Sequence, residues 1–158
     1  MKLLAELLQK AGQSVHVLLG GQTNAQMRNQ LLALKDAIAP VIVCATGKFI
    51  GEGFDDSRLD TLFLTMPISW RGTLAQYVGR LHRLHEGKRE VRVYDYIDVN
   101  AAMLEKMYHK RLKGYASLGY SVLTEQDAAP GSDVIYDQVT FQNRFLQDIA
   151  QARQSVLI

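Results

Sequence analysis

The sequence of 158 residues contains a single cysteine and no long apolar run. Cys44 therefore cannot form an internal disulfide, and because it lies within an apolar stretch we expect a buried, unreactive thiol. No segment approaches the roughly 18 apolar residues that a membrane-spanning helix requires. Polar residues interrupt the N-terminal leucines, which argues against a secretory signal peptide. These absences favour a globular, cytoplasmic protein without a membrane partner.

An excess of one charge is also missing, since 18 Lys and Arg against 16 Asp and Glu give a net charge of +2. Such a small value does not by itself indicate nucleic-acid binding. The basic residues are nevertheless concentrated in two stretches, Arg71–Arg92 and Lys106–Lys113. Stretches of this kind can form a phosphate-binding surface, although they are also common on solvent-exposed helices.

Apolar periodicity divides the chain into alternating helices and strands. We expect strands over 14–19, 41–45, 60–66 and 90–96, and helices over 2–11, 23–37, 74–84, 101–118 and 138–156. Strands separated by helices imply right-handed crossovers and a parallel sheet, so the predicted fold class is α/β. The uninterrupted apolar run Val41–Ala45 predicts a strand that is covered on both faces. We expect one domain over residues 1–120, followed by a linker and a C-terminal helix over 121–158.

The segment Leu74–Leu84 combines an apolar helical face with a polar one. The apolar face contains Leu74, Tyr77, Val78, Leu81 and Leu84, and the opposite face contains Gln76, Arg80 and Arg83. Thr73 is expected to be the N-cap, and Gly79 leaves the backbone beside the arginines uncovered. Two arginines one turn apart suit a polyphosphate, because each guanidinium can hold two oxygens and stays charged. Two ordinary surface arginines are the alternative reading.

A second pattern precedes this helix. The strand Val41–Ala45 is followed by Thr46 and then by Gly51-Glu52-Gly53-Phe54-Asp55, while the helix contains Gln76-x-x-Gly79-Arg80-x-x-Arg83. In this order the two patterns resemble motifs V and VI of superfamily 2 helicases, the nucleic-acid-dependent NTPases of the DEAD/DEAH type. The segment Pro67–Leu74 is similar to a bacterial subgroup related to restriction-enzyme motor subunits. The resemblance covers about Leu3 to Tyr120 and implies a RecA-like C-terminal motor lobe.

The resemblance also implies roles for individual residues. ATP with Mg²⁺ would lie between two lobes, with Arg80 and Arg83 as arginine fingers and Arg83 as the preferred one. Contacts to ATP, or to the residues that bind it, would come from Gln76, Gly79, Glu52, Gly53 and Asp55. The backbone of DNA or RNA would be contacted, independently of sequence, by Thr46, Gly47 and Lys48.

The chain also departs from the family pattern. It contains no Walker A loop, because Lys48 is followed by Phe49 and Ile42 stands where the leading glycine would be. It also lacks an Asp-Glu-x-His box, so ATP and Mg²⁺ would be bound mainly by an N-terminal lobe supplied in cis or in trans. The family's lobe begins with one more strand, which is central, and its absence predicts a gap in the sheet. We expect no ATPase activity from this chain alone.

Two other interpretations stay open, a non-catalytic nucleic-acid-binding or regulatory module and an inactive remnant of such a lobe. Other chemistry is disfavoured by the sequence. His82 and His85 have a spacing that could bind a metal, but neighbouring guanidiniums would repel a cation, so no metal site is expected. Asp95 and Asp98 are expected to be a turn acid and a helix cap.

Overall fold

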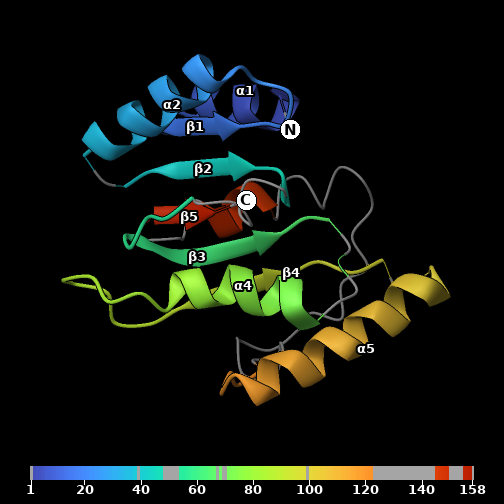
Figure 1. Cartoon of the computed structure of the whole chain (residues 1–158). Helices are drawn as coiled ribbons and strands as arrows, with labels where there is room; N and C mark the ends of the chain where they lie inside the picture. The colour runs from blue at the N-terminus through green and yellow to red at the C-terminus, as the bar shows by residue number, and fades with distance from the viewer. Residues whose placement is uncertain are drawn as a thin grey trace.

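The computed structural model describes residues 2–38, 40–47, 54–66, 68, 71–98, 100–122, 145–149 and 155–157. Within these residues the strands form one parallel sheet in the order β1-β2-β5-β3-β4 (Figure 1). The strands are β1 (Val15–Leu18), β2 (Ile42–Ala45), β3 (Leu59–Leu64), β4 (Arg92–Asp95) and β5 (Ser155–Leu157). The helices are α1 (Lys2–Lys10), α2 (Asn24–Asp36), α4 (Arg71–Leu81) and α5 (Ala102–Ser117). The predicted parallel α/β class is therefore confirmed.

Two apolar clusters cover the two faces of the sheet. The first joins the sheet to α2, α4 and α5, and its members include Leu18, Leu34, Val43, Leu62, Leu74, Val78, Leu81 and Tyr115. The second joins the sheet to α1 and the helical segment 145–149, and it contains Leu8, Ile42, Cys44, Phe63, Phe145 and Ile149. Alternate residues of β2 belong to different clusters, so this strand is covered on both faces, as its unbroken apolar sequence predicts.

One predicted helix end is confirmed, and the two ends of α4 differ from prediction. The capping box of α2 is confirmed, because Gln26 N donates to Thr23 Oγ1 and Thr23 N donates to Gln26 Oε1. Helix α4 begins at Arg71, so Thr73 lies inside its first turn and is not the N-cap. The same helix ends at Leu81, and Leu84, predicted to face the core, is 97% exposed.

Helix α5 shows two similar differences from prediction. Its N-cap is Ala101, which makes no side-chain cap hydrogen bond, so neither Asp98 nor Asn100 fills that role. Met103, placed by periodicity on the core face, is instead 70% exposed. The buried residues of α5 lie in its second half and are Arg111, Gly114 and Tyr115, of which Tyr115 belongs to the first core cluster.

The expected gap in the sheet is filled by the C-terminal segment. Strand β5 lies between β2 and β3 and pairs with both in parallel (Figure 1). The predicted helix over 138–156 is confirmed for 145–149 and is wrong for Ser155 and Val156, which belong to β5. Open inner edges of β2 and β3 would leave backbone donors and acceptors buried without partners, and pairing with β5 removes that cost. No described helix has the length and apolarity needed to span a membrane.

Candidate functional site

Helix α4 contacts both ends of the segment that leads from β2 towards β3. At the first end, a Cβ built on Gly47 would overlap the hydroxyl of Tyr77, a side chain that is only 5% exposed. At the second end, Arg80 Nη1 donates a hydrogen bond to the backbone oxygen of Phe54. The two patterns singled out in the sequence therefore meet along one helix, although Phe54 and Arg80 are 26 positions apart.

The second arginine also points towards this segment. Arg83 Nη1 forms an ion pair with the carboxylate of Asp55, and the two side chains are 51% and 41% exposed. On the same helix Gln76 and Gly79 are exposed. Arg83 lies just beyond the end of α4, so the polar row continues into the following turn. The arrangement places two guanidiniums along Phe54 and Asp55, and the exposed Arg83–Asp55 pair is accessible to a soluble anion.

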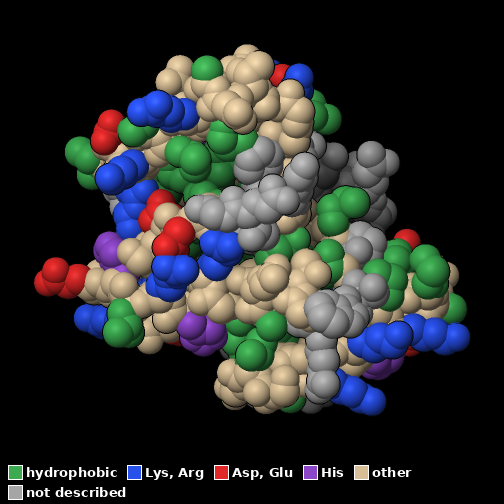
Figure 2. All heavy atoms as spheres, in the orientation of Figure 1, with side chains coloured by type: hydrophobic (Ala, Val, Ile, Leu, Met, Phe, Trp, Pro, Cys, Tyr) green, Lys and Arg blue, Asp and Glu red, His purple; other side chains and the backbone are tan. Residues whose placement is uncertain are grey.

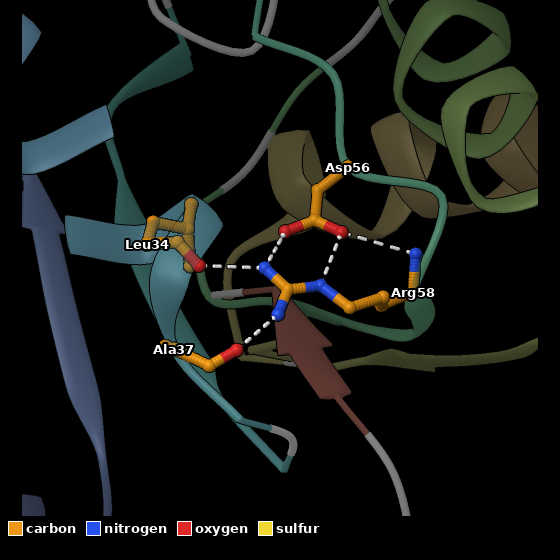
Figure 3. A network of polar contacts seen from close by, with 4 residues as sticks. All are labelled: Leu34, Ala37, Asp56 and Arg58. Atoms are coloured by element: carbon orange, nitrogen blue, oxygen red, sulfur yellow. Dashed lines mark hydrogen bonds and ion pairs between the residues drawn. The ribbon is translucent and has the colours of Figure 1, made fainter. Parts of the chain in front are cut away.

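A clamp of polar contacts fixes the segment after Asp55, and sequence reasoning did not find it. Arg58 donates to both carboxylate oxygens of Asp56, from Nε at 2.9 Å and from Nη2 at 2.6 Å. The same guanidinium donates to the backbone oxygens of Ala37 (2.6 Å) and Leu34 (2.7 Å), at the C-terminal end of α2 (Figure 3). Leu34 O also accepts a hydrogen bond from the backbone nitrogen of Ala37 (3.3 Å), so Arg58 adds a second donor there and ties the segment to the end of α2.

Lys88 plays a comparable part at the end of α4. Its Nζ donates to the backbone oxygens of Leu81 (2.8 Å) and Arg83 (2.9 Å). Burial lowers the pKa of Lys88, while the charges of Asp60 and Asp56 raise it and reduce the shift. A cation at a helix C-terminus is favourable because the last carbonyl groups carry partial negative charge. Lys88 thereby fixes the backbone from which the Arg83 side chain extends.

The second basic stretch contains a buried charge that the sequence did not indicate. Arg111 is 3% exposed and donates to Asp95 from Nε (2.7 Å) and Nη2 (2.8 Å). It also donates from Nη1 to the backbone oxygen of Ile68 (2.9 Å), and the Tyr115 hydroxyl donates to Asp95 (3.0 Å). Asp95 is therefore not a turn acid, and Arg111 is not part of a phosphate-binding surface. Together they join α5 to the end of β4 and to the connection before α4.

The proposed nucleic-acid contacts lie at the carboxyl end of β2. Thr46 N donates to the backbone oxygen of Leu18 (3.1 Å), and Gly47 is exposed. Thr46 Oγ1 is buried, and within the part of the chain that the structure describes it has no hydrogen-bond partner. Three predicted site residues, Lys48, Glu52 and Gly53, lie outside the described residues.

His82, one of the two histidines considered as metal ligands, contacts an aromatic side chain. His82 Nε2 lies 2.9 Å from the hydroxyl of Tyr120, and the two rings are in edge contact. Burial raises the pKa of Tyr120 to about 12, so this hydroxyl stays protonated at neutral pH. Among the described residues, no group of three or more His, Cys, Asp or Glu could hold a metal ion.

Comparison with known proteins supports the fold. No family model and no curated protein matches the sequence. Among solved structures, the chain is similar to one described as the C-terminal part of the Fun30 ATPase domain, with a TM-score of 0.56 and 17% sequence identity. The match covers 94% of this chain and 42% of that structure, so the chain spans less than half of the neighbour's length. At this identity the likeness concerns the fold alone, and it supports a RecA-like parallel α/β fold for this chain.

Proposed function

We propose that this chain acts as the C-terminal lobe of an ATP-dependent nucleic-acid translocase of superfamily 2. In this proposal Arg80 and Arg83 reach the γ-phosphate of ATP, which is held with Mg²⁺ mainly by an N-terminal lobe in cis or in trans. The observation that carries the proposal is the orientation of both guanidiniums towards Phe54 and Asp55. Arginine forks placed beside a transferring phosphoryl group stabilise the charge that develops on it.

Other residues have subordinate roles in this proposal. Gln76 and Gly79 lie on the exposed side of α4, which is consistent with contacts to the γ-phosphate. Asp55, with Glu52 and Gly53, would report the state of the nucleotide, and Thr46, Gly47 and Lys48 would contact nucleic-acid phosphates. Because Pro67–Leu74 is similar to a bacterial helicase subgroup, we extend the proposal to a motor related to the motor subunits of restriction enzymes. We propose that it acts in the cytoplasm.

A nuclear magnetic resonance titration tests where nucleotide binds. Uniformly ¹⁵N-labelled chain is titrated with ATP and then ADP, each with Mg²⁺, and shifts of the backbone amide signals are mapped. We expect the largest ATP-dependent shifts at Phe54, Asp55, Gln76 and Arg80, with smaller shifts for ADP. Shifts located elsewhere, or the same pattern in an Arg80→Gln/Arg83→Gln variant, would contradict the proposal. The chain alone is expected to hydrolyse no ATP, because the residues that hold the metal and phosphates belong to the other lobe.

A non-catalytic nucleic-acid-binding module is the second candidate, and one surface of α5 favours it. Lys106, Lys110 and Lys113 are exposed and spaced i, i+4 and i+7, which places them on one side of the helix. Figure 2 shows Lys and Arg side chains along α5, at the lower right of the view. Three ammonium groups in a row can contact successive phosphates of a single strand.

Fluorescence anisotropy with a labelled single strand separates the two candidates. A Lys106→Gln/Lys110→Gln/Lys113→Gln variant should reduce the slope of log K against log salt by about 2, since each phosphate contact contributes about 0.7. The matched control changes three lysines elsewhere, Lys2, Lys10 and Lys35, to glutamine and should leave the slope unchanged. Binding that ATP does not alter would favour the non-catalytic module, whereas binding that depends on ATP would favour the motor lobe.

A further inference from the structure

We propose that Asp55 is an intramolecular counter-ion that holds Arg83 in a resting position until an incoming phosphate displaces it. This inference rests on the proposed function, because it assumes that Arg83 binds the phosphate of a nucleotide. The observation behind it is the ion pair between Arg83 and Asp55, which connects the turn after α4 with the segment before β3. A carboxylate can occupy the place of a phosphate at a guanidinium, since both groups offer two oxygens to the same pair of N–H donors.

Two adjacent carboxylates have very different surroundings in this segment. The side chain of Asp56 is 9% exposed and accepts hydrogen bonds from the backbone nitrogen and the guanidinium of Arg58. The side chain of Asp55 is 41% exposed and faces Arg83, which is 51% exposed. One carboxylate is therefore fixed in the structure, whereas its neighbour is presented to solvent on an anchored backbone.

The backbones on both sides of the ion pair are fixed. Arg58 ties the segment carrying Asp55 to the last carbonyl groups of α2 (Figure 3). Lys88 holds the backbone oxygen of Arg83 at 2.9 Å. Exchange of Asp55 for a phosphate therefore requires rotation of side chains alone. A long-range rearrangement of the lobe is not needed.

The exposure of the pair makes this exchange easy. Solvent-exposed ion pairs contribute little to stability, because water screens them and both side chains lose rotational freedom when they pair. A triphosphate, which carries several negative charges, can compete with such a partner. The Arg111–Asp95 pair, whose side chains are 3% and 8% exposed, could not be exchanged in the same way. The position of Arg83 therefore suits a reversible contact.

Isothermal titration calorimetry with inorganic tripolyphosphate tests the inference through a double-mutant cycle. Asp55→Asn should tighten binding by about two- to fivefold, the range expected when an exposed ion pair is released. Glu86→Gln removes an exposed acid from the same turn region and serves as the matched control, with no comparable gain expected. In an Arg83→Gln background, Asp55→Asn should give no gain, because the pair is already broken.

The outcomes separate the two proposals. If Arg83→Gln does not weaken tripolyphosphate binding, the proposed function of Arg83 fails. If it does weaken binding, but Asp55→Asn gives the same gain with and without Arg83, then Asp55 acts by general charge repulsion and the counter-ion inference fails.

A measurement without ligand tests the resting pair directly. Arginine side-chain NMR of the free chain should show slowed rotation of the Arg83 guanidinium, released by Asp55→Asn and unaffected by Glu86→Gln. Free rotation of the Arg83 guanidinium in the unsubstituted chain would overturn the inference, whatever the calorimetry shows.

Discussion

Replacement of Arg111 by methionine tests whether a buried ion pair joins α5 to the site. The change removes three hydrogen bonds, two to Asp95 and one to the backbone oxygen of Ile68. The Asp95 carboxylate, which is 8% exposed, then keeps the hydrogen bond from the Tyr115 hydroxyl at 3.0 Å but has lost its positive partner. A buried charge without its partner typically costs about 3–5 kcal/mol. That loss would be a large fraction of the roughly 5–15 kcal/mol that stabilises a typical domain.

Urea unfolding followed by circular dichroism measures this cost. With a slope of about 2 kcal/mol per molar urea, a loss of 3–5 kcal/mol lowers the midpoint by about 2 M. The variant Arg111→Met/Asp95→Val removes both charges and should recover most of the loss, because a packed apolar pair is often as stable as a buried ion pair.

The control for this experiment is an exposed ion pair. Arg92 pairs with Glu90, and their side chains are 54% and 62% exposed. Arg92→Met should therefore cost no more than about 1 kcal/mol. The reasoning is refuted if Arg111→Met costs as little as Arg92→Met, or if adding Asp95→Val to Arg111→Met lowers the midpoint further.

Three further predictions concern the core and the site. Burial raises the pKa of Asp60 from its ordinary value of 3.8, although a hydrogen bond from Thr61 and the charges of Lys88 and Arg92 oppose the shift. The folded state therefore binds this proton more tightly than the unfolded state, and stability falls as pH rises from 3.8 through the raised pKa. Asp60→Asn should accordingly raise the urea midpoint at neutral pH and have little effect below 3.8; an equal effect at both pH values would contradict this. Burial raises the pKa of Cys44 to about 11, so a thiol reagent at neutral pH should modify this residue only in the unfolded chain, and rapid modification of the native chain would show that the strand is accessible. Gly47→Ala should destabilise the chain by about 1–3 kcal/mol, because the added methyl group overlaps the hydroxyl of Tyr77, a side chain that belongs to the core. Adding Tyr77→Phe should recover part of that loss in the same unfolding assay, and a lack of recovery would place the cause elsewhere.

Local patterns in the sequence were sufficient to predict several elements. The capping box of α2 depends on Thr23 and Gln26, three residues apart, and the apolar run of β2 signals a covered strand on its own. The end of α4 could not be read in this way. Its apolar periodicity continues to Leu84, but the helix ends at Leu81. There the ammonium group of Lys88 donates a hydrogen bond to the backbone oxygen of Leu81.

Features that depend on distant residues were not predictable from periodicity. Arg111 and Asp95 lie on different elements, and nothing in a basic helical stretch distinguishes a buried guanidinium from exposed lysines. Strand β5 is similar, since its pairing with β2 and β3 joins residues more than 90 positions apart. A helical pattern was the stronger local signal there, and the unpaired edges of the sheet outweighed it.

The candidate site was predictable in part because each of its two motifs is a short, continuous stretch of sequence. Their resemblance to helicase motifs indicated Arg80, Arg83 and Asp55. In the structure Arg83 pairs with Asp55, 28 positions away, and Arg80 donates to the backbone oxygen of the neighbouring Phe54. The Asp56–Arg58 clamp and Lys88 were missed, because they support the site through backbone oxygens that no side-chain pattern reveals.

The most direct test of the central claim is the ratio of ATP affinity to ADP affinity, measured by calorimetry on the whole chain with Mg²⁺. If Arg83 contacts the γ-phosphate, the unsubstituted chain should bind ATP more tightly than ADP by about two- to fivefold. Arg83→Gln should lower this ratio, and Arg80→Gln/Arg83→Gln should reduce it to about one. An equal affinity for both nucleotides, or a ratio that Arg83→Gln leaves unchanged, would contradict the account.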